Sequence, residues 1–245
     1  MRVKKVLMAK SGEKFYVPDD TKDYHMQFGT VRKDEFQNPV THSNAKEKTL
    51  HIIDADFKDN YMRMKRLAQI MHVKDLGRII SETGVGPESI VVDAGTGTGA
   101  AACFLARYVK HVISYDINEV HQAVARENAK ELEITNITFK IQDITQGITE
   151  RKIDLVLLDL PEPWQALETA LVCLKRGGYL VTYSPTILQV HQSVTSAEER
   201  EDLIYIKTIE IIEREWHVTQ KSVRPKMGDL SHTGFLSFFR NVRPT

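Results

Sequence analysis

The sequence is poor in cysteine and lacks any long apolar run. Its two cysteines, Cys103 and Cys173, stand in no CxxC or CxH spacing, which indicates buried reduced thiols rather than a zinc site. No window approaches the ~18 to 20 consecutive apolar residues that a membrane span needs. The first residues, MRVKKVLMAKSGEK, return to charged side chains too soon for a secretory signal. We therefore expect a cytoplasmic protein with no metal ion and no membrane segment.

An excess of charge of either sign is also missing. The chain has 33 Lys and Arg residues against 33 Asp and Glu residues, so its composition gives no support to a nucleic-acid partner. Phosphate contacts would have to come from local basic segments, although each of these is equally explained as a solvated face. The candidate segments are residues 62–74, Lys221 with Arg224 and Lys226, and Arg240 with Arg243.

The chain, of 245 residues and 42% hydrophobic, is long enough for one large domain with an appendage. Residues 1–57 alternate short β-branched or aromatic runs with turn signals, which predicts a small β-rich N-terminal domain. From Asp59 onward, apolar residues recur near helical spacing until Gly84, where a helix would stop. We therefore expect one domain over residues 1–57 and a second over residues 58–245.

Alternating strands and helices follow Gly86 and Pro87. Short strands that are apolar throughout indicate a parallel sheet with helices on both faces, a doubly wound α/β domain. Expected strands cover 89–93, 112–116, 137–143, 154–160 and 179–184, and expected helices cover 98–108, 119–131, 164–174 and 186–200. The β-branched content of residues 203–213 favours a further strand. We expect residues 216–223 and 234–240 to pair as an antiparallel ribbon on the sheet edge.

A glycine-rich loop, VVDAGTGTGAAA, lies between the first strand of this domain and the next helix. Glycines there let the backbone turn tightly and let a ligand approach the helix N-terminus. Gly95, Gly97 and Ala100 satisfy the dinucleotide fingerprint, and Asp116 stands where that fold places its ribose-binding acid. By itself the loop does not distinguish a dinucleotide from S-adenosylmethionine.

Four carboxylates favour S-adenosylmethionine. Asp93, Asp116, Asp143 and Asp159 end four successive strands, and open α/β sheets bind ligands at that edge. A cationic sulfonium nucleoside tolerates such an acidic rim better than a pyrophosphate would. Each aspartate taken alone could instead cap a turn at a strand end.

Three segments besides the glycine loop carry a resemblance to a known family: DNYMRMKRLAQIMHVKD (59–75), LLDLPEPW (157–164) and HTGFLSFFR (232–240). With them, the chain resembles the tRNA (adenine-58-N1)-methyltransferases, a family of class I S-adenosylmethionine-dependent enzymes. The resemblance implies a Rossmann-like, mostly parallel, seven-stranded sheet joined to a small β-rich domain. It also implies a homotetramer that methylates adenine N1 in the tRNA T-loop at position 58. Some similar members also act on the neighbouring position 57, and the sequence leaves open whether one or both positions are methylated.

The resemblance also assigns roles to residues. Gln69 would contact the cofactor, and the loop residues Gly95, Thr96, Gly97, Thr98 and Gly99 would hold its methionine part. Asp116 would bind the ribose with His121 beside it, Asp143 would bind the adenine, and Asp93 could face the amino-acid end. Asp159 would face both the cofactor and the target base, as the catalytic carboxylate. Pro161 and Pro163 would stiffen the loop after it, and Trp164 is expected to pack beneath.

Two histidines are candidate substrate-binding residues. His72 stands where the family often has the tyrosine of YPKD, so it either stacks on the base or is a core histidine. His232 either reaches the pocket from the C-terminal segment or is a surface residue at a strand start.

Other functions stay open on sequence alone. They are a methyltransferase for another RNA, a small molecule or a protein, a noncatalytic RNA-binding subunit, and a nucleotide-dependent oxidoreductase. The last lacks an evident catalytic His, Lys or Tyr constellation.

Overall fold

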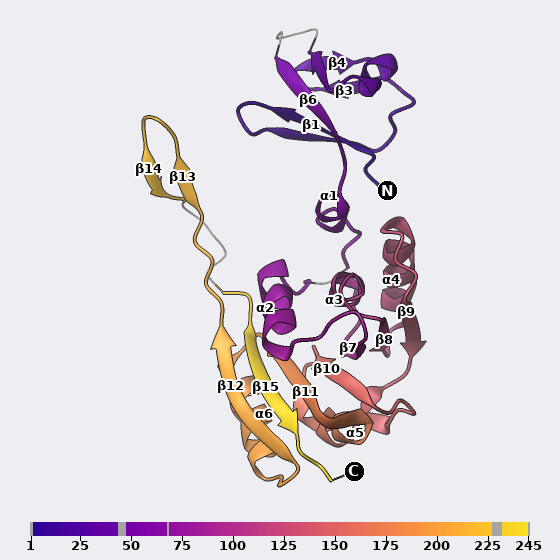
Figure 1. Ribbon diagram of the computed structural model, residues 1–245, viewed down its shortest axis with the longest axis vertical. Helices are drawn as coiled ribbons and strands as arrows, with labels where there is room; N and C mark the ends of the chain where they lie inside the picture. Colours follow the sequence, from indigo (N-terminus) through magenta and orange to yellow (C-terminus); the bar gives the residue numbers. More distant parts are fainter. Residues whose placement is uncertain (1, 44–47, 68, 227–231, 245) are drawn as a thin grey trace. The chain divides into compact units, whose positions relative to one another are not determined.

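The computed structural model describes residues 2–43, 48–67, 69–226 and 232–244 (Figure 1). The chain divides into two compact units, one formed by Met1–Lys65 with Glu131–Glu133 and the other by Arg66–Lys130 with Ile134–Thr245. The domain division at residues 57 and 58 stays a prediction. Among the described residues, no helix combines the length and the apolar character that crossing a membrane requires.

The N-terminal unit is β-rich, as predicted. Its antiparallel sheet has the order β2-β1-β6-β5, formed by β1 (Lys5–Ala9), β2 (Lys14–Val17), β5 (Val40–His42) and β6 (Thr49–Asp54). The other elements are the hairpin of β3 (Tyr24–Met26) and β4 (Gly29–Val31), the 3₁₀ helix η1 (Lys33–Gln37) and α1 (Phe57–Tyr61). A small core closes the unit, in which Leu7, Phe36 and Leu50 are almost fully buried.

The C-terminal unit confirms the Rossmann-like fold. Its sheet has seven strands in the order β12-β15-β11-β10-β7-β8-β9, and the five strands from β11 to β9 are parallel neighbours. They are β7 (Ile90–Ala94), β8 (His111–Asp116), β9 (Ile137–Ile141), β10 (Ile153–Leu158) and β11 (Leu174–Ser184). Buried residues such as Val92, Val156 and Leu158 join the core beneath the flanking helices. Strands covered on both faces explain the continuous apolar runs in the sequence.

The flanking helices are α2 (Val73–Thr83), α3 (Ala100–Leu105), α4 (Glu119–Glu131), α5 (Leu167–Cys173) and α6 (Ile187–Glu198). Two 3₁₀ turns, η2 (Ile144–Gln146) and η3 (Pro163–Ala166), follow β9 and β10. Gly84 ends α2 in a left-handed conformation with φ of 65°, as predicted. The helical pattern from Asp59 to Gly84 nevertheless belongs to two helices, because His72 is extended and caps α2. The buried Met64 and Met71 between them keep the apolar spacing without a helix.

The predicted ribbon of 216–223 with 234–240 is wrong. Strand β15 (Phe235–Asn241) lies inside the sheet, antiparallel to both β11 and β12 (Leu203–Glu210) (Figure 1). Its side chains are buried on both faces, Leu236 and Phe238 as well as Ser237, so it needs two neighbours. Instead, β13 (Trp216–Val218) pairs with β14 (Val223–Pro225). The strand expected in residues 203–213 is confirmed by β12.

Candidate active site

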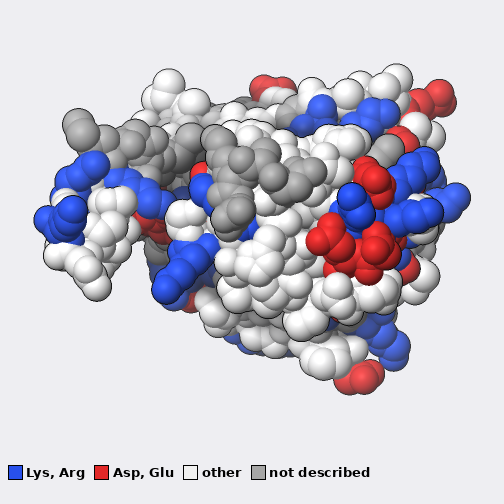
Figure 2. Space-filling view, turned by 90° about the horizontal axis from the view of Figure 1, so that it is seen from above, with Lys and Arg blue, Asp and Glu red and all other residues white. Residues whose placement is uncertain are grey.

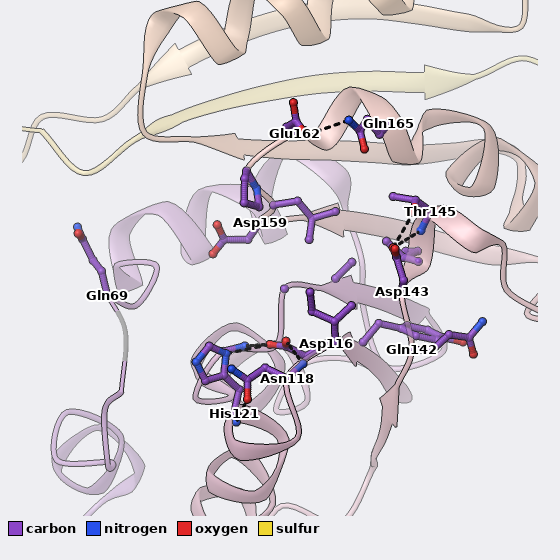
Figure 3. A pocket seen from close by; sticks show the side chains of 18 residues that line it. Gln69, Asp116, Asn118, His121, Gln142, Asp143, Thr145, Asp159, Glu162 and Gln165 are labelled. Carbon is purple, nitrogen blue, oxygen red and sulfur yellow. Dashed lines mark hydrogen bonds and ion pairs between the residues drawn. The ribbon is translucent and has the colours of Figure 1, made fainter.

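A cavity of about 570 Å³ opens at the C-terminal edge of the parallel strands (Figure 3). Gln69, Asp116 and Asp159 face the same space from three different segments. Its lining consists of Gln69, Ala94, Gly95, Gly97, Tyr115, Asp116, Ile117, Asn118, His121, Gln142, Asp143, Ile144, Thr145, Asp159, Leu160, Pro161, Glu162 and Gln165. The aspartates that end β8, β9 and β10 therefore meet in one cavity, as strand order predicts.

The three loop glycines have different roles. Gly95 has φ of 95°, and a Cβ there would lie 2.0 Å from the carbonyl oxygen of Asp159, so the loop packs directly on the end of β10. At Gly99 a Cβ would lie 2.9 Å from the Ala125 Cβ, which makes this glycine a contact between the loop and α4. A Cβ at Gly97 would meet only the Gly95 carbonyl oxygen, at 3.9 Å. Gly97 is therefore the position where a ligand can approach the backbone.

Asp116 is held in place by the loop itself. Its Oδ2 accepts a hydrogen bond from the Gly97 amide at 2.8 Å, and its Oδ1 accepts one from the Asn118 amide at 2.9 Å. The Nδ1 of His121 lies 3.4 Å from the same Oδ2. These contacts fix the carboxylate before any ligand arrives, and its remaining lone pairs can accept from ribose hydroxyls.

Asp143 is both a turn cap and part of the cavity wall. Its Oδ1 accepts from the Thr145 amide at 2.9 Å and from the Thr145 hydroxyl at 2.7 Å. Its Oδ2 has no hydrogen-bond partner among the described residues. Asp143 can therefore be both a turn cap and a ligand-binding residue, because one oxygen caps the turn and the other can accept from an amino group.

Asp159 follows β10, with its amide donating to the Ala94 carbonyl at 2.8 Å. Burial raises the pKa of its carboxyl to about 7, and the negative charge of Asp93 adds to the shift. At neutral pH this carboxyl therefore exists as both acid and carboxylate. A cation beside it would favour the carboxylate.

Asp93 lies behind the cavity and does not line it. Its Oδ2 accepts from the Ser114 hydroxyl at 2.6 Å, and its Oδ1 has no partner among the described atoms. Burial raises its pKa to about 6, against the Ser114 hydrogen bond, and the charge of Asp116 adds to the rise. Asp93 is thus close enough to Asp159 for its charge to raise the pKa of that carboxyl.

Thr96 and Thr98 support the loop from behind. Thr96 Oγ1 lies 2.7 Å from Ser114 Oγ and accepts from Gln122 Nε2 at 3.0 Å. Because Ser114 donates to Asp93, the Thr96 hydroxyl must donate to Ser114. Thr98 is buried, and its hydroxyl has no partner among the described atoms. Neither threonine lines the cavity.

The two candidate substrate histidines do not reach the cavity. His72 caps α2, with its Nδ1 3.5 Å from the Lys74 amide. His232 Nδ1 lies 2.6 Å from Glu210 Oε1, and its Nε2 lies 2.9 Å from the Pro185 oxygen. Both hydrogen bonds raise the pKa of His232, and the one to the Pro185 oxygen has the larger effect. Both acceptors favour an N–H on the nitrogen that faces them, which is why they raise the pKa.

Five polar lining residues were missed by the sequence reasoning: Asn118, Gln142, Thr145, Glu162 and Gln165. All five lie within six residues of a strand-end aspartate, so widening the window around Asp116, Asp143 and Asp159 would have found them. The loop after Asp159 is fixed by Gln189, whose Nε2 donates to the Pro161 oxygen at 2.9 Å. Trp164 packs against the core, as expected.

The lining fits S-adenosylmethionine better than a dinucleotide. None of the described lining residues is Lys or Arg, so a pyrophosphate would meet carboxylates without a neutralising side chain. The open backbone at Gly97 and the free Oδ2 of Asp143 suit a cationic nucleoside instead. We conclude that the residues present fit this cofactor.

Comparisons with known proteins agree with this geometry. The family model described as "tRNA methyltransferase complex GCD14 subunit" matches residues 60–233. A Methanocaldococcus jannaschii relative, tRNA (adenine(57)-N(1)/adenine(58)-N(1))-methyltransferase TrmI, is 32% identical over 96% of this chain and 94% of its own length. A Thermus thermophilus relative, tRNA (adenine(58)-N(1))-methyltransferase TrmI, is 34% identical over 73% of this chain and 72% of its own.

Two solved structures share the fold over nearly the whole chain. A Thermotoga maritima protein described as an S-adenosylmethionine-dependent O-methyltransferase has a TM-score of 0.89 and 26% identity, covering 99% of this chain and 94% of that one. The tRNA (m1A58) methyltransferase TrmI of Aquifex aeolicus has a TM-score of 0.84 and 21% identity, covering 100% and 99%. Through the family model and the relatives in Methanocaldococcus and Thermus, the chain belongs to the tRNA (adenine-58-N1)-methyltransferase family of class I S-adenosylmethionine-dependent methyltransferases.

Proposed function

We propose that this protein methylates N1 of adenine 58 in the tRNA T-loop, using S-adenosylmethionine. The observation that carries the proposal is Asp159, a half-buried carboxylate in the cavity that also contains Asp116 and Asp143. Adenine 57 is a further target of the same site, because the Methanocaldococcus relative is named for both positions. Mass spectrometry of tRNA nucleosides after incubation with the protein tests both assignments.

The cofactor supplies an electrophilic methyl group on a sulfonium. Asp116, preset by the Gly97 amide, would bind the ribose hydroxyls, and the free Oδ2 of Asp143 would accept from the adenine amino group. The Gly97 backbone and Gln69 would lie along the methionine part. We assign Thr96, Thr98, Gly99 and Asp93 to the support of this surface, since they lie behind it.

Asp159 suits the chemistry of adenine N1. This nitrogen is a weak nucleophile whose lone pair lies in the ring plane, next to the exocyclic amino group. By accepting a hydrogen bond from that amino group, the carboxylate would orient the base and increase electron density at N1. Methylation leaves the adenine cationic, so the charge that develops meets an anion already in place. N1 carries no proton, so no general base is needed and alignment provides much of the rate.

Cofactor affinity is expected to rise as the pH increases from about 6 to about 7. Below these pKa values Asp93 and Asp159 are neutral, and above them they are carboxylates that attract the sulfonium. Calorimetric titrations at several pH values measure the effect. In Asp159→Asn the part of the rise near pH 7 should disappear; equal affinity across this range in the unaltered protein would contradict the assignment.

The target adenine must leave its stacked position before N1 can reach the methyl group. The tRNA must then be held by its backbone, and the exposed Lys221 with Arg224 is the first proposed contact. Arg240 is held by Gly177 and Tyr179, and Arg243 by Glu168, so these two arginines would have to exchange these partners for phosphates. Figure 2 shows Lys and Arg side chains in several separate groups on the visible face, in keeping with the balanced composition. Contacts spread over several groups let a protein of zero net charge bind RNA.

Binding of tRNA is expected to weaken strongly as salt concentration rises, because each phosphate contact releases counterions. Filter binding between about 50 and about 200 mM salt measures the slope. Lys221→Gln combined with Arg224→Gln should reduce the slope, whereas Lys10→Gln, in the N-terminal unit, serves as a comparison. A slope near zero would argue against tRNA as the partner.

We further propose a cytoplasmic homotetramer. A Kluyveromyces lactis relative is named a catalytic subunit, so the alternative is a complex with a second, noncatalytic chain. Light scattering on the purified protein decides between these assemblies.

A second candidate function is methylation of a hydroxyl group, because the similar Thermotoga structure is described as an O-methyltransferase. A hydroxyl must lose its proton during the transfer, and Asp159, with a pKa of about 7, could accept it. The two functions differ in their products, which are N1-methyladenosine and a methyl ether.

A further inference from the structure

A buried polar cluster joins the start of α2 to the segment before β15. The ammonium group of Lys74 donates to Asp75 Oδ1 at 3.1 Å, to the Ile211 carbonyl at 2.6 Å and to Thr233 Oγ1 at 2.7 Å. The Thr233 hydroxyl in turn donates to Asp75 Oδ2 at 2.7 Å. Asp75 is fully buried and the Lys74 side chain is 9% exposed. The hydroxyl of Thr233 therefore bridges both ions of a buried pair.

The backbone of the same segment holds Tyr183. The Tyr183 hydroxyl donates to the Thr233 carbonyl at 2.6 Å. The ring lies close against Gly234, where a Cβ would come within 2.5 Å of a ring carbon. Tyr183 is therefore fixed by two neighbouring residues, one through a hydrogen bond and the other through close packing.

Tyr183 in turn lies beside Asp159. Leu158 pairs with Thr182 across the parallel strands β10 and β11, so Asp159 and Tyr183 follow side by side. Burial raises the pKa of Tyr183, and the charges of Asp75 and Asp159 add to the rise. The tyrosine thus lies within electrostatic range of both Asp75 and the cavity carboxylate Asp159.

A buried ion pair is weak evidence for stability, because desolvation offsets much of the attraction. Its value here is geometric, since the Thr233 hydroxyl donates to one ion of the pair and accepts from the other. We propose that Thr233 is a positioning residue for methyl transfer: it fixes the Lys74–Asp75 pair and, through Tyr183, the position of Asp159. This inference rests on the proposed function, and it gives a physical reason for a threonine and a glycine in HTG.

The test compares Thr233→Val, which removes the hydroxyl at nearly constant shape, with Thr233→Ser, which keeps it. Thr208→Val is the matched control, because it removes a hydroxyl that lies 2.8 Å from Ser237 Oγ in the same sheet. For each variant one measures kcat, KM for tRNA, cofactor affinity and hydrogen exchange of residues 73–76.

Thr233→Val should lower kcat by about 10- to 100-fold, as misplacement of a reacting group does, and leave cofactor affinity unchanged. Thr233→Ser and Thr208→Val should keep kcat near that of the unaltered protein. Equal kcat in Thr233→Val and Thr233→Ser would overturn the proposal, as would the same loss in Thr208→Val. If Thr233→Val does not fold, Tyr183→Phe removes the hydrogen bond to Thr233 alone, and unchanged kcat in it would overturn the proposal.

Hydrogen exchange separates this proposal from the proposed function, because it needs no turnover. Faster exchange of residues 73–76 in Thr233→Val than in Thr233→Ser supports the cluster even if the unaltered protein does not methylate tRNA. Equal exchange in the two variants contradicts it.

Discussion

Replacing Asp159 with alanine is expected to lower the rate of adenine methylation by about 100- to 1,000-fold, the loss typical when one group that stabilises transition-state charge is removed. The amino group of the target base loses its acceptor, and the cation that forms loses the nearby anion. Cofactor binding should survive, because Asp116 and Asp143 remain in the cavity, although above pH 7 the affinity loses the contribution of the Asp159 carboxylate. Single-turnover methylation and a cofactor titration on the same sample measure both effects.

Glu162→Ala provides the matched control for Asp159→Ala. Glu162 is a second carboxylate of the same loop, and it accepts from Gln165 Nε2 at 2.9 Å. Its removal should cost much less turnover than the removal of Asp159. Near-normal turnover in Asp159→Ala would remove the catalytic role from this residue.

Loss of stability cannot explain the expected defect of Asp159→Ala. The folded pKa of about 7 lies above the ordinary value of 3.8, so between these values the folded state binds more protons than the unfolded state. The contribution of Asp159 to stability therefore falls as the pH rises through this window. The alanine variant has no carboxyl at this position and does not lose stability in this way. Above pH 7 its melting temperature should therefore equal or exceed that of the unaltered protein.

Gly95→Ala is expected to destabilise the C-terminal unit by about 3 kcal/mol or more, through overpacking and backbone strain together. The new Cβ would lie 2.0 Å from the Asp159 carbonyl oxygen, and a backbone atom of β10 cannot move aside as a flexible side chain can. Separation of the loop from β10 would also disturb Asp159. Cofactor affinity should fall together with the free energy of unfolding.

Gly12→Ala is the matched control for this contact. Gly12 has φ of 92°, close to the 95° of Gly95, but a Cβ there would meet nothing within 4 Å. Both variants carry the strain of a left-handed backbone, and only Gly95→Ala adds the collision. Denaturant unfolding measures the difference, and equal losses in the two variants would show that the contact with Asp159 is unimportant.

The arrangement of the acids followed from the sequence because strand order alone places them. Asp116, Asp143 and Asp159 each follow an apolar run, and the carboxyl ends of parallel strands share one edge. Asp93 follows the same rule but is fully buried behind the cavity, where it accepts from the Ser114 hydroxyl. Whether a strand-end residue faces the ligand or the loop depends on backbone angles that the sequence does not reveal.

Longer-range features escaped the sequence. No proline or glycine marks the break between α1 and α2, so the apolar spacing looked continuous across it. The insertion of β15 between β11 and β12 depends on burial of both its faces, which the pattern GFLSFFR indicates only once a sheet partner is known. The pairing of Thr233 with Asp75, across 158 residues, and with Lys74 is likewise visible only in the structure.

The measurement that tests the account most directly is methyl transfer from labelled S-adenosylmethionine to unmodified tRNA, with the product nucleosides resolved by mass spectrometry. We expect N1-methyladenosine at T-loop position 58, formed by the unaltered protein and at least about 100-fold more slowly by Asp159→Ala. Cofactor binding without tRNA methylation, or a methyl ether on another acceptor, would contradict it.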